Sequence, residues 1–134
     1  MKGSQRSLPS AVTPEGVNVH EADWGDIHVS FQSYKTSFDI SPLLQGLPDN
    51  LCQSPHWGYI LKGEILVTYK SGIEERITEG NAFYLAPGHT MYITGGTEYI
   101  EFSPVDVYNE MAFSIMRNMR RALSEPIAAA KPAG

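Results

Sequence analysis

The sequence predicts an all-β protein in which one barrel or sandwich is closed by a single C-terminal helix. Its 134 residues are enough for one domain. Short apolar or alternating segments recur along the middle of the chain at intervals of about 8–12 residues, and turn residues separate them. Only one segment, near the C-terminus, has apolar residues at helical spacing.

The strands are predicted from period-2 alternation and from dense apolar runs. Residues 27–31 (IHVSF) alternate apolar with polar side chains, which is typical of a half-buried strand. Lys70-Ser-Gly72 and Gly95-Gly96 each separate two such runs and are typical of tight hairpins. The expected strands cover residues 27–31, 58–62, 64–69, 73–77, 82–85, 91–94 and 98–102.

The helix is predicted over residues 105–123, after Ser103-Pro104. Acidic side chains fall in its first turns and arginines in its last turns, which matches the helix dipole. Residues 1–16 and 124–134 are rich in Ser, Pro, Gly or Ala without a periodic pattern, so we expect flexible tails there. The expected domain, barrel plus helix, is then residues 17–123.

The charge and the cysteine content of the chain argue against several classes of protein. The formal net charge is −5, which disfavours binding to nucleic acid or to an anionic membrane surface. No apolar run reaches the roughly 20 residues of a membrane span, and the N-terminus lacks the apolar stretch of a signal peptide. The only cysteine, Cys52, excludes an internal disulfide. We therefore expect a cytoplasmic protein.

Residues 46–96 carry a resemblance to a known family. His56-Trp-Gly-Tyr-Ile-Leu-Lys-Gly63 has the spacing of the E-x6-G segment that ends the first cupin motif, with His56 in place of the glutamate. Counting back, Cys52 and Asn50 stand where that motif has its two histidines. The chain therefore resembles the cupins, which are small jelly-roll barrels.

The second cupin motif also matches in part. Gly80 and Gly88 have the family's separation, whereas Met91 stands where the family has a histidine. His89 lies two residues earlier, and residues two apart on a strand face the same way. The resemblance thus implies a jelly-roll barrel with a C-terminal helix and an altered set of metal ligands, and homodimers are a family expectation.

The expected ligands are Cys52, His56 and His89. One thiolate and two imidazoles suit Zn²⁺ with an open fourth position. Iron or manganese is the alternative and would need a carboxylate, which only Glu101 could supply if it pointed inward. We expect zinc, with catalytic residues unassigned.

The remaining expectations concern the pocket and its use. We expect Asn50, Met91, Ile93, His28 and Glu101 to line it, and a small organic molecule to bind or react there. The alternatives are a metal-free binding module with a decayed metal site, and an interaction protein that uses the methionine-containing face of the helix.

Overall fold

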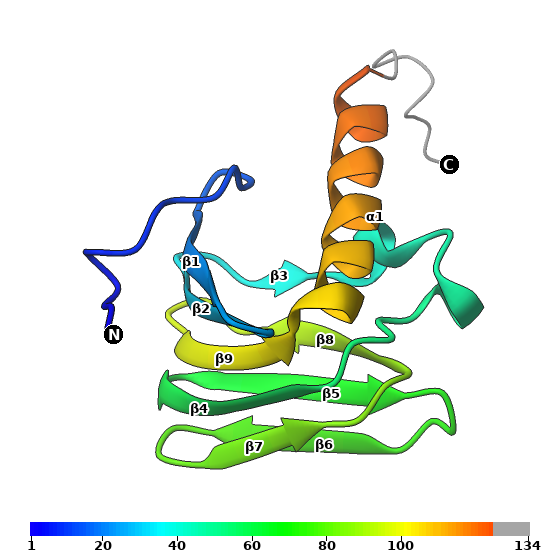
Figure 1. The fold of residues 1–134 in the computed structure, drawn as a ribbon. Helices are drawn as coiled ribbons and strands as arrows, with labels where there is room; N and C mark the ends of the chain where they lie inside the picture. Colours follow the sequence, from blue (N-terminus) through cyan, green and yellow to red (C-terminus); the bar gives the residue numbers. More distant parts are fainter. Residues whose placement is uncertain (125–134) are drawn as a thin grey trace.

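Two antiparallel sheets face each other and form a flattened barrel (Figure 1). The computed structural model describes residues 1–124, so the tail expected at 124–134 lies, apart from Ser124, outside the described residues. The first sheet has the order β1 (Val17–Trp24), β2 (Ile27–Tyr34), β9 (Glu98–Pro104), β4 (His56–Lys62) and β7 (Ala82–Leu85). The second has the order β3 (Phe38–Asp39), β8 (His89–Ile93), β5 (Glu64–Tyr69) and β6 (Glu74–Thr78).

Strand alternation decides which side chains enter the barrel. In β9, Tyr99, Glu101 and Ser103 are buried while their neighbours are half-exposed. In β8, His89 and Met91 are buried and Tyr92 is exposed. The barrel interior therefore receives polar side chains from β9 and β8 at the same level.

The apolar core occupies one part of the barrel. Its largest members are completely buried aliphatic side chains, each contributing about 1.5–3 kcal/mol on burial. They include Ile60, Ile65, Val67, Leu85 and Ile93. A second, smaller cluster consists of Leu44, Cys52 and Met111.

Gly63 joins β4 to β5 in a backbone conformation that favours glycine. Its φ is +79°, and the Thr97 hydroxyl lies where a Cβ would stand. That hydroxyl accepts a hydrogen bond from Glu64 N and donates one to Glu64 O. Glycine at position 63 therefore accommodates this tight corner between the two sheets.

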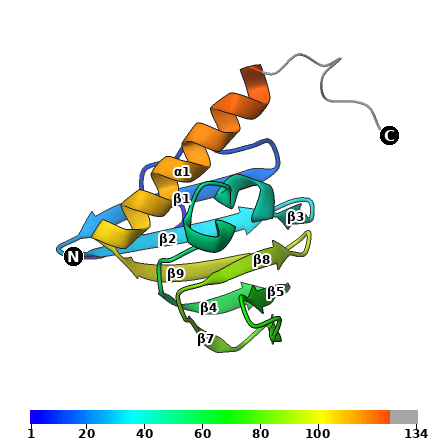
Figure 2. The same cartoon turned by 90° about the vertical axis from the view of Figure 1, so that its right-hand side faces the viewer.

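The helix α1 (Val105–Ser124) follows β9 without a connecting loop and rises away from the barrel (Figure 2). Its side chains pack against a 3₁₀ segment, η1 (Ser41–Leu44). The Asn118 amide donates to the carbonyl oxygens of Leu43 and Gln45 at 2.8 and 2.9 Å. The expected C-terminal helix is confirmed.

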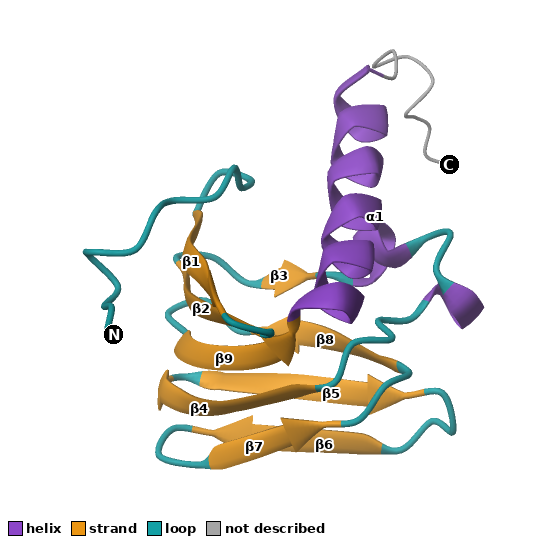
Figure 3. Cartoon of the chain, in the orientation of Figure 1, coloured by secondary structure: helices purple, strands orange, loops and turns teal. Residues whose placement is uncertain are grey.

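Each expected strand overlaps an observed one, but two strands were not expected. β1 pairs along its whole length with β2, and the short β3 pairs with β8. Figure 3 shows the N-terminal segment as loop alongside β1, where Ala11 N donates to Val19 O at 2.8 Å. Flexibility of residues 1–16 stays a prediction. Within the described part of the chain, no helix is long and apolar enough to span a membrane.

Candidate metal centre and cavity

A cavity of about 250 Å³ lies between the barrel and α1. Polar side chains from β4, β8 and β9 form its base, and α1, β1 and η1 supply mainly apolar walls. Cys52, His56, His89 and Glu101 belong to the base. All four are almost fully buried, so their chemistry is set by the protein rather than by bulk water.

Cys52 reaches this base from a loop rather than from a strand. It follows a second 3₁₀ segment, η2 (Pro48–Asn50), and precedes β4. Its backbone forms an isolated bridge with the start of β8, in which Cys52 N donates to His89 O at 2.8 Å. Gly88 N donates to Cys52 O at 2.8 Å. These backbone bonds hold Cys52 next to His89, although 37 residues separate them in the sequence (89 − 52 = 37).

The three expected metal ligands come together. One ligand atom from each of Cys52, His56 and His89 lies within 4.8 Å of the others. Cys52 Sγ is 3.5 Å from His56 Nε2, and the two imidazole centroids are 5.2 Å apart. The cluster is 1–4% exposed.

Hydrogen bonds at the far nitrogen orient both imidazoles. His89 Nδ1 lies 2.7 Å from the Ala86 carbonyl oxygen, which can only accept, so Nδ1 carries the proton. Nε2 of His89 is then left with a lone pair, and it is buried without a hydrogen-bond partner. His56 Nδ1 lies 2.6 Å from the Ser103 hydroxyl, which leaves its Nε2 facing Cys52. Both rings therefore present Nε2 to the cluster.

Burial sets the protonation of the cluster. It lowers the pKa of His56 to about 3, with repulsion from His89 and His28 adding to the effect. Burial also lowers the pKa of His89, against a hydrogen bond to Ala86 that raises it. Both imidazoles are therefore neutral at pH 7. Burial raises the pKa of the Cys52 thiol to about 12, so the thiol keeps its proton until a cation replaces it.

The donor set and its spacing fit a zinc ion. Bonds of about 2.3 Å to sulfur and about 2.0–2.1 Å to nitrogen place those two atoms roughly 3.6 Å apart around a tetrahedral ion. The observed Sγ–Nε2 distance of 3.5 Å agrees with that separation. The unpartnered Nε2 of His89 supplies the third donor.

Glu101 points inward but stands behind His56. Its Oε1 lies 3.6 Å from His56 Nδ1, the nitrogen that faces away from Cys52. Burial raises the pKa of this carboxyl to about 8, although the charge of His28 opposes the shift. Its Oε2 is buried without a hydrogen-bond partner. Glu101 thus lies beside His56 and can contact a molecule in the cavity, of which it is a lining residue.

Among the other expected pocket residues, Met91 lines the cavity and three do not. Asn50 is exposed in η2, where its side chain accepts a hydrogen bond from Gly46 N. Ile93 shares the face of His89 but lies further along β8, inside the filled apolar core. His28 shares the inner face of β2, but Tyr108 stacks on its ring at 3.8 Å and covers it.

The cavity wall carries a polar network that was not expected from the sequence. Gln32 Oε1 accepts hydrogen bonds from the hydroxyls of Tyr34 and Tyr99, both at 2.6 Å. Gln32 Nε2 donates to Ser30 Oγ at 2.9 Å. Ser30, Gln32 and Tyr34 alternate along β2, so extending the expected strand beyond residue 31 would have placed them on the inner face.

Known structures support the same fold. The polyketide cyclase RemF from Streptomyces resistomycificus is 12% identical, with a TM-score of 0.56 over 79% of this chain and 80% of that one. An RmlC-like cupin from Shewanella frigidimarina is 14% identical, with a TM-score of 0.54 over 78% and 90%. An oxalate decarboxylase variant from Bacillus subtilis is 13% identical, with a TM-score of 0.54 over 76% and 28%.

Sequence comparisons add nothing to this likeness: no protein-family model matches the chain, and no curated protein matches it. Sequence identities this low support a shared fold but not a shared function. The order of strands, the two facing sheets and the structural neighbours agree with the resemblance of residues 46–96. The protein therefore has the cupin fold.

Proposed function

We propose that this protein binds one zinc ion through Cys52, His56 and His89 and holds a small organic molecule in the cavity next to it. The observation that carries the proposal is the lone pair of His89 Nε2, which is buried without a hydrogen-bond partner beside the Cys52–His56 pair. A cation is the partner that such a nitrogen, a second neutral imidazole and a thiol can share.

Zinc is favoured over iron and manganese by the donors. A thiolate and two imidazoles are soft to borderline ligands, whereas non-haem iron sites commonly use two histidines and a carboxylate. The carboxylate at the base of the cavity, Glu101, is beside the Nδ1 of His56, on the wrong side of the ring to bind the same ion. Iron or manganese remains the alternative only if Glu101 changes its position.

The cavity would allow a small molecule to bind next to the zinc ion. Bound zinc would act as a Lewis acid toward an oxygen atom of the small molecule. Glu101 would contact the same molecule through its unpartnered Oε2, and the Ser103 hydroxyl would hold His56 in place through Nδ1. The cavity walls would exclude water from the centre.

Elemental analysis of the purified protein tests the metal. We expect about one zinc per chain in the native protein and less than a tenth of that in Cys52→Ala. Met91→Leu is the matched control, because Met91 lines the same cavity without being a ligand, and it should keep its zinc. Iron or manganese in place of zinc would refute the choice of ion.

A metal-free binding module is the second candidate, and the exchange of two family ligands for Asn50 and Met91 favours it. It predicts no stoichiometric metal in any of the three proteins. It also predicts an unchanged melting temperature when EDTA is added, whereas a zinc protein loses stability on chelation.

A homodimer and a cytoplasmic location stay predictions. Trp57, Tyr59 and Tyr84 are exposed on the outer face of β4 and β7, and the first and last of these rings are 5.3 Å apart. We propose that a second copy of the chain covers this apolar surface. Sedimentation velocity should report a dimer for the native protein and a monomer for Trp57→Glu.

A further inference from the structure

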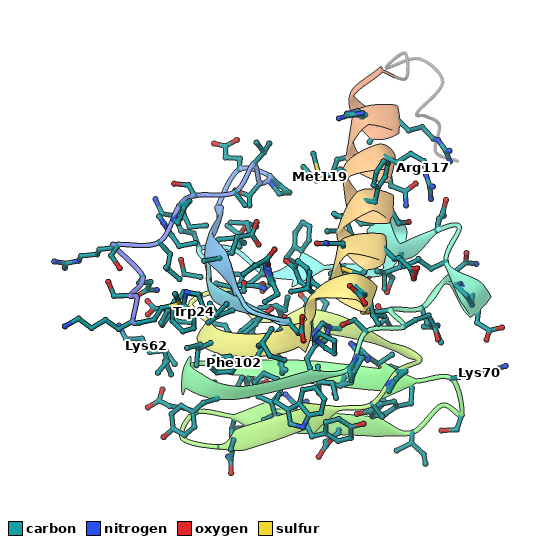
Figure 4. The ribbon with its side chains drawn as sticks, in the orientation of Figure 1. Trp24, Lys62, Lys70, Phe102, Arg117 and Met119 are labelled. Carbon is teal, nitrogen blue, oxygen red and sulfur yellow. The ribbon has the colours of Figure 1, made fainter. Side chains whose placement is uncertain are left out.

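The cavity is divided into a polar base and an apolar upper part. One stripe of α1 provides the upper wall, with Met111, Ile115, Met116 and Met119 lining the cavity. Figure 4 shows Met119 on the side of the helix that faces the N-terminal segment and Arg117 on the opposite side. This part of the helix therefore offers side chains with no polar atom except a weakly accepting thioether.

The facing wall is also mainly apolar, although Thr13 and Glu21 belong to it. β1 contributes Val17 and Val19, and the N-terminal segment contributes Val12 and Pro14. Val12 is 81% exposed and Met116 is 43% exposed, so the upper part of the cavity opens to solvent between the N-terminal segment and α1. An apolar group entering there would cover apolar surface that water now contacts.

The polar side chains along the middle of the wall are already paired. The hydroxyls of Tyr34 and Tyr99 both donate to Gln32 Oε1, and the Gln32 amide donates to Ser30. Among the described residues, the buried side-chain nitrogen and oxygen atoms without a partner are His89 Nε2 and Glu101 Oε2. The demand for a polar ligand group is therefore concentrated at the base.

The charge at that base selects the sign of the polar group. A divalent zinc ion with one thiolate and two neutral imidazoles keeps one net positive charge, which favours an anionic oxygen donor at the open position. The volume of about 250 Å³ corresponds to roughly eight water molecules, and hence to a chain of about that many carbon atoms.

Resting on the zinc site proposed above, we propose that the small molecule is a medium-chain carboxylate of about eight carbon atoms. Its carboxylate binds at the Cys52–His56–His89 centre, and its chain runs along the apolar stripe of α1 toward Met116.

A series of straight-chain carboxylates tests this ligand class. Isothermal titration calorimetry on the zinc-loaded protein should give an affinity that rises about fourfold per methylene from butyrate to octanoate, or roughly 200-fold across the series. Beyond octanoate the rise should stop. Octan-1-ol should bind at least ten times more weakly than octanoate. An affinity that does not change with chain length, or an affinity for octan-1-ol equal to that for octanoate, would overturn the proposal.

Two variants of α1 locate the chain-binding wall. Met116→Glu places a charge in the apolar part and should weaken octanoate binding more than tenfold. Phe113→Glu is the matched control, because Phe113 is 75% exposed on the same helix and does not line the cavity, and it should bind octanoate like the native protein. Equal affinities of the two variants would contradict the placement.

Zinc content measured on the same samples separates the two proposals. Stoichiometric zinc with no chain-length dependence leaves the metal site standing and refutes the ligand class. A protein without zinc that still binds octanoate with the fourfold increments refutes the metal site, while the apolar part of the ligand site stands.

Discussion

The affinity of the centre for zinc should depend steeply on pH, because of one proton. Burial raises the pKa of the Cys52 thiol to about 12, so the thiol is protonated at every pH at which the protein is handled. Zinc binds the thiolate and must displace that proton. The histidines contribute little, since burial lowers the pKa of His56 to about 3 and lowers that of His89 as well.

The size of the effect follows from this count. One proton released per zinc raises the apparent association constant tenfold per pH unit, or about 1.4 kcal/mol. The slope of the logarithm of the apparent association constant against pH should be constant between about pH 6 and 8, because the thiol pKa lies well above that range. Two histidines with ordinary pKa values would instead make the slope steeper below about pH 6.5.

Competition with a coloured zinc chelator measures this slope. Glu101→Gln is the better protein for the assay, because burial raises the pKa of the Glu101 carboxyl to about 8 and its titration would add to the signal. We expect a slope of one in Glu101→Gln. A slope near zero there, or the same slope in Glu101→Gln carrying Cys52→Ala, would refute Cys52 as the source of the proton.

Three further predictions concern the stability of the fold. Between about pH 4.5 and 8, the Glu101 carboxyl keeps its proton in the folded protein, whereas the unfolded chain has released it. Urea titrations should therefore show that the free energy of unfolding of the native protein falls across that range, relative to Glu101→Gln, by a few kcal/mol. Gly63→Ala should lower the free energy of unfolding, measured by calorimetry, by about 3 kcal/mol, because a Cβ there would collide with Thr97. Gly72→Ala is the control: its φ is also positive but its surroundings are open, so the loss should be only about 1 kcal/mol. Tyr108→Phe removes a hydrogen bond from α1 to a carboxylate of β1 and should lower the free energy of unfolding by about 1–2 kcal/mol, and an unchanged value would show that ring stacking alone holds this end of the helix.

The strands that alternate cleanly could be predicted from the sequence, and β1 could not. Along Val17–Trp24 most side chains are only half-buried, and Glu21 and Asp23 bind the two nitrogens of His28 on the neighbouring strand. These carboxylates interrupt the alternation of apolar and polar residues that would have indicated a strand. They pair with a residue of the neighbouring strand, and a single sequence does not show which strands are neighbours.

The ligand trio could be predicted from the sequence, but its geometry could not. The separation of four residues would place Cys52 and His56 on one face of a continuous strand, yet Cys52 lies in the loop before β4. Its position depends instead on the backbone bridge to His89. Residue type and motif register therefore identified the cluster, while its geometry depends on a long-range contact that local periodicity does not encode.

The arrangement argues against a decayed metal site. No protein group satisfies the lone pair of His89 Nε2, and that nitrogen lies with Cys52 and His56 in one cluster of potential metal ligands. The bond from His89 Nδ1 to Ala86 also fixes the tautomer that leaves that lone pair free. Asn50, at the position of a family ligand, turns to the outside, so three donors remain where four would close the coordination shell. The departures from the family motif thus leave an open coordination position beside an apolar cavity, which is the arrangement that a ligand-binding zinc centre requires.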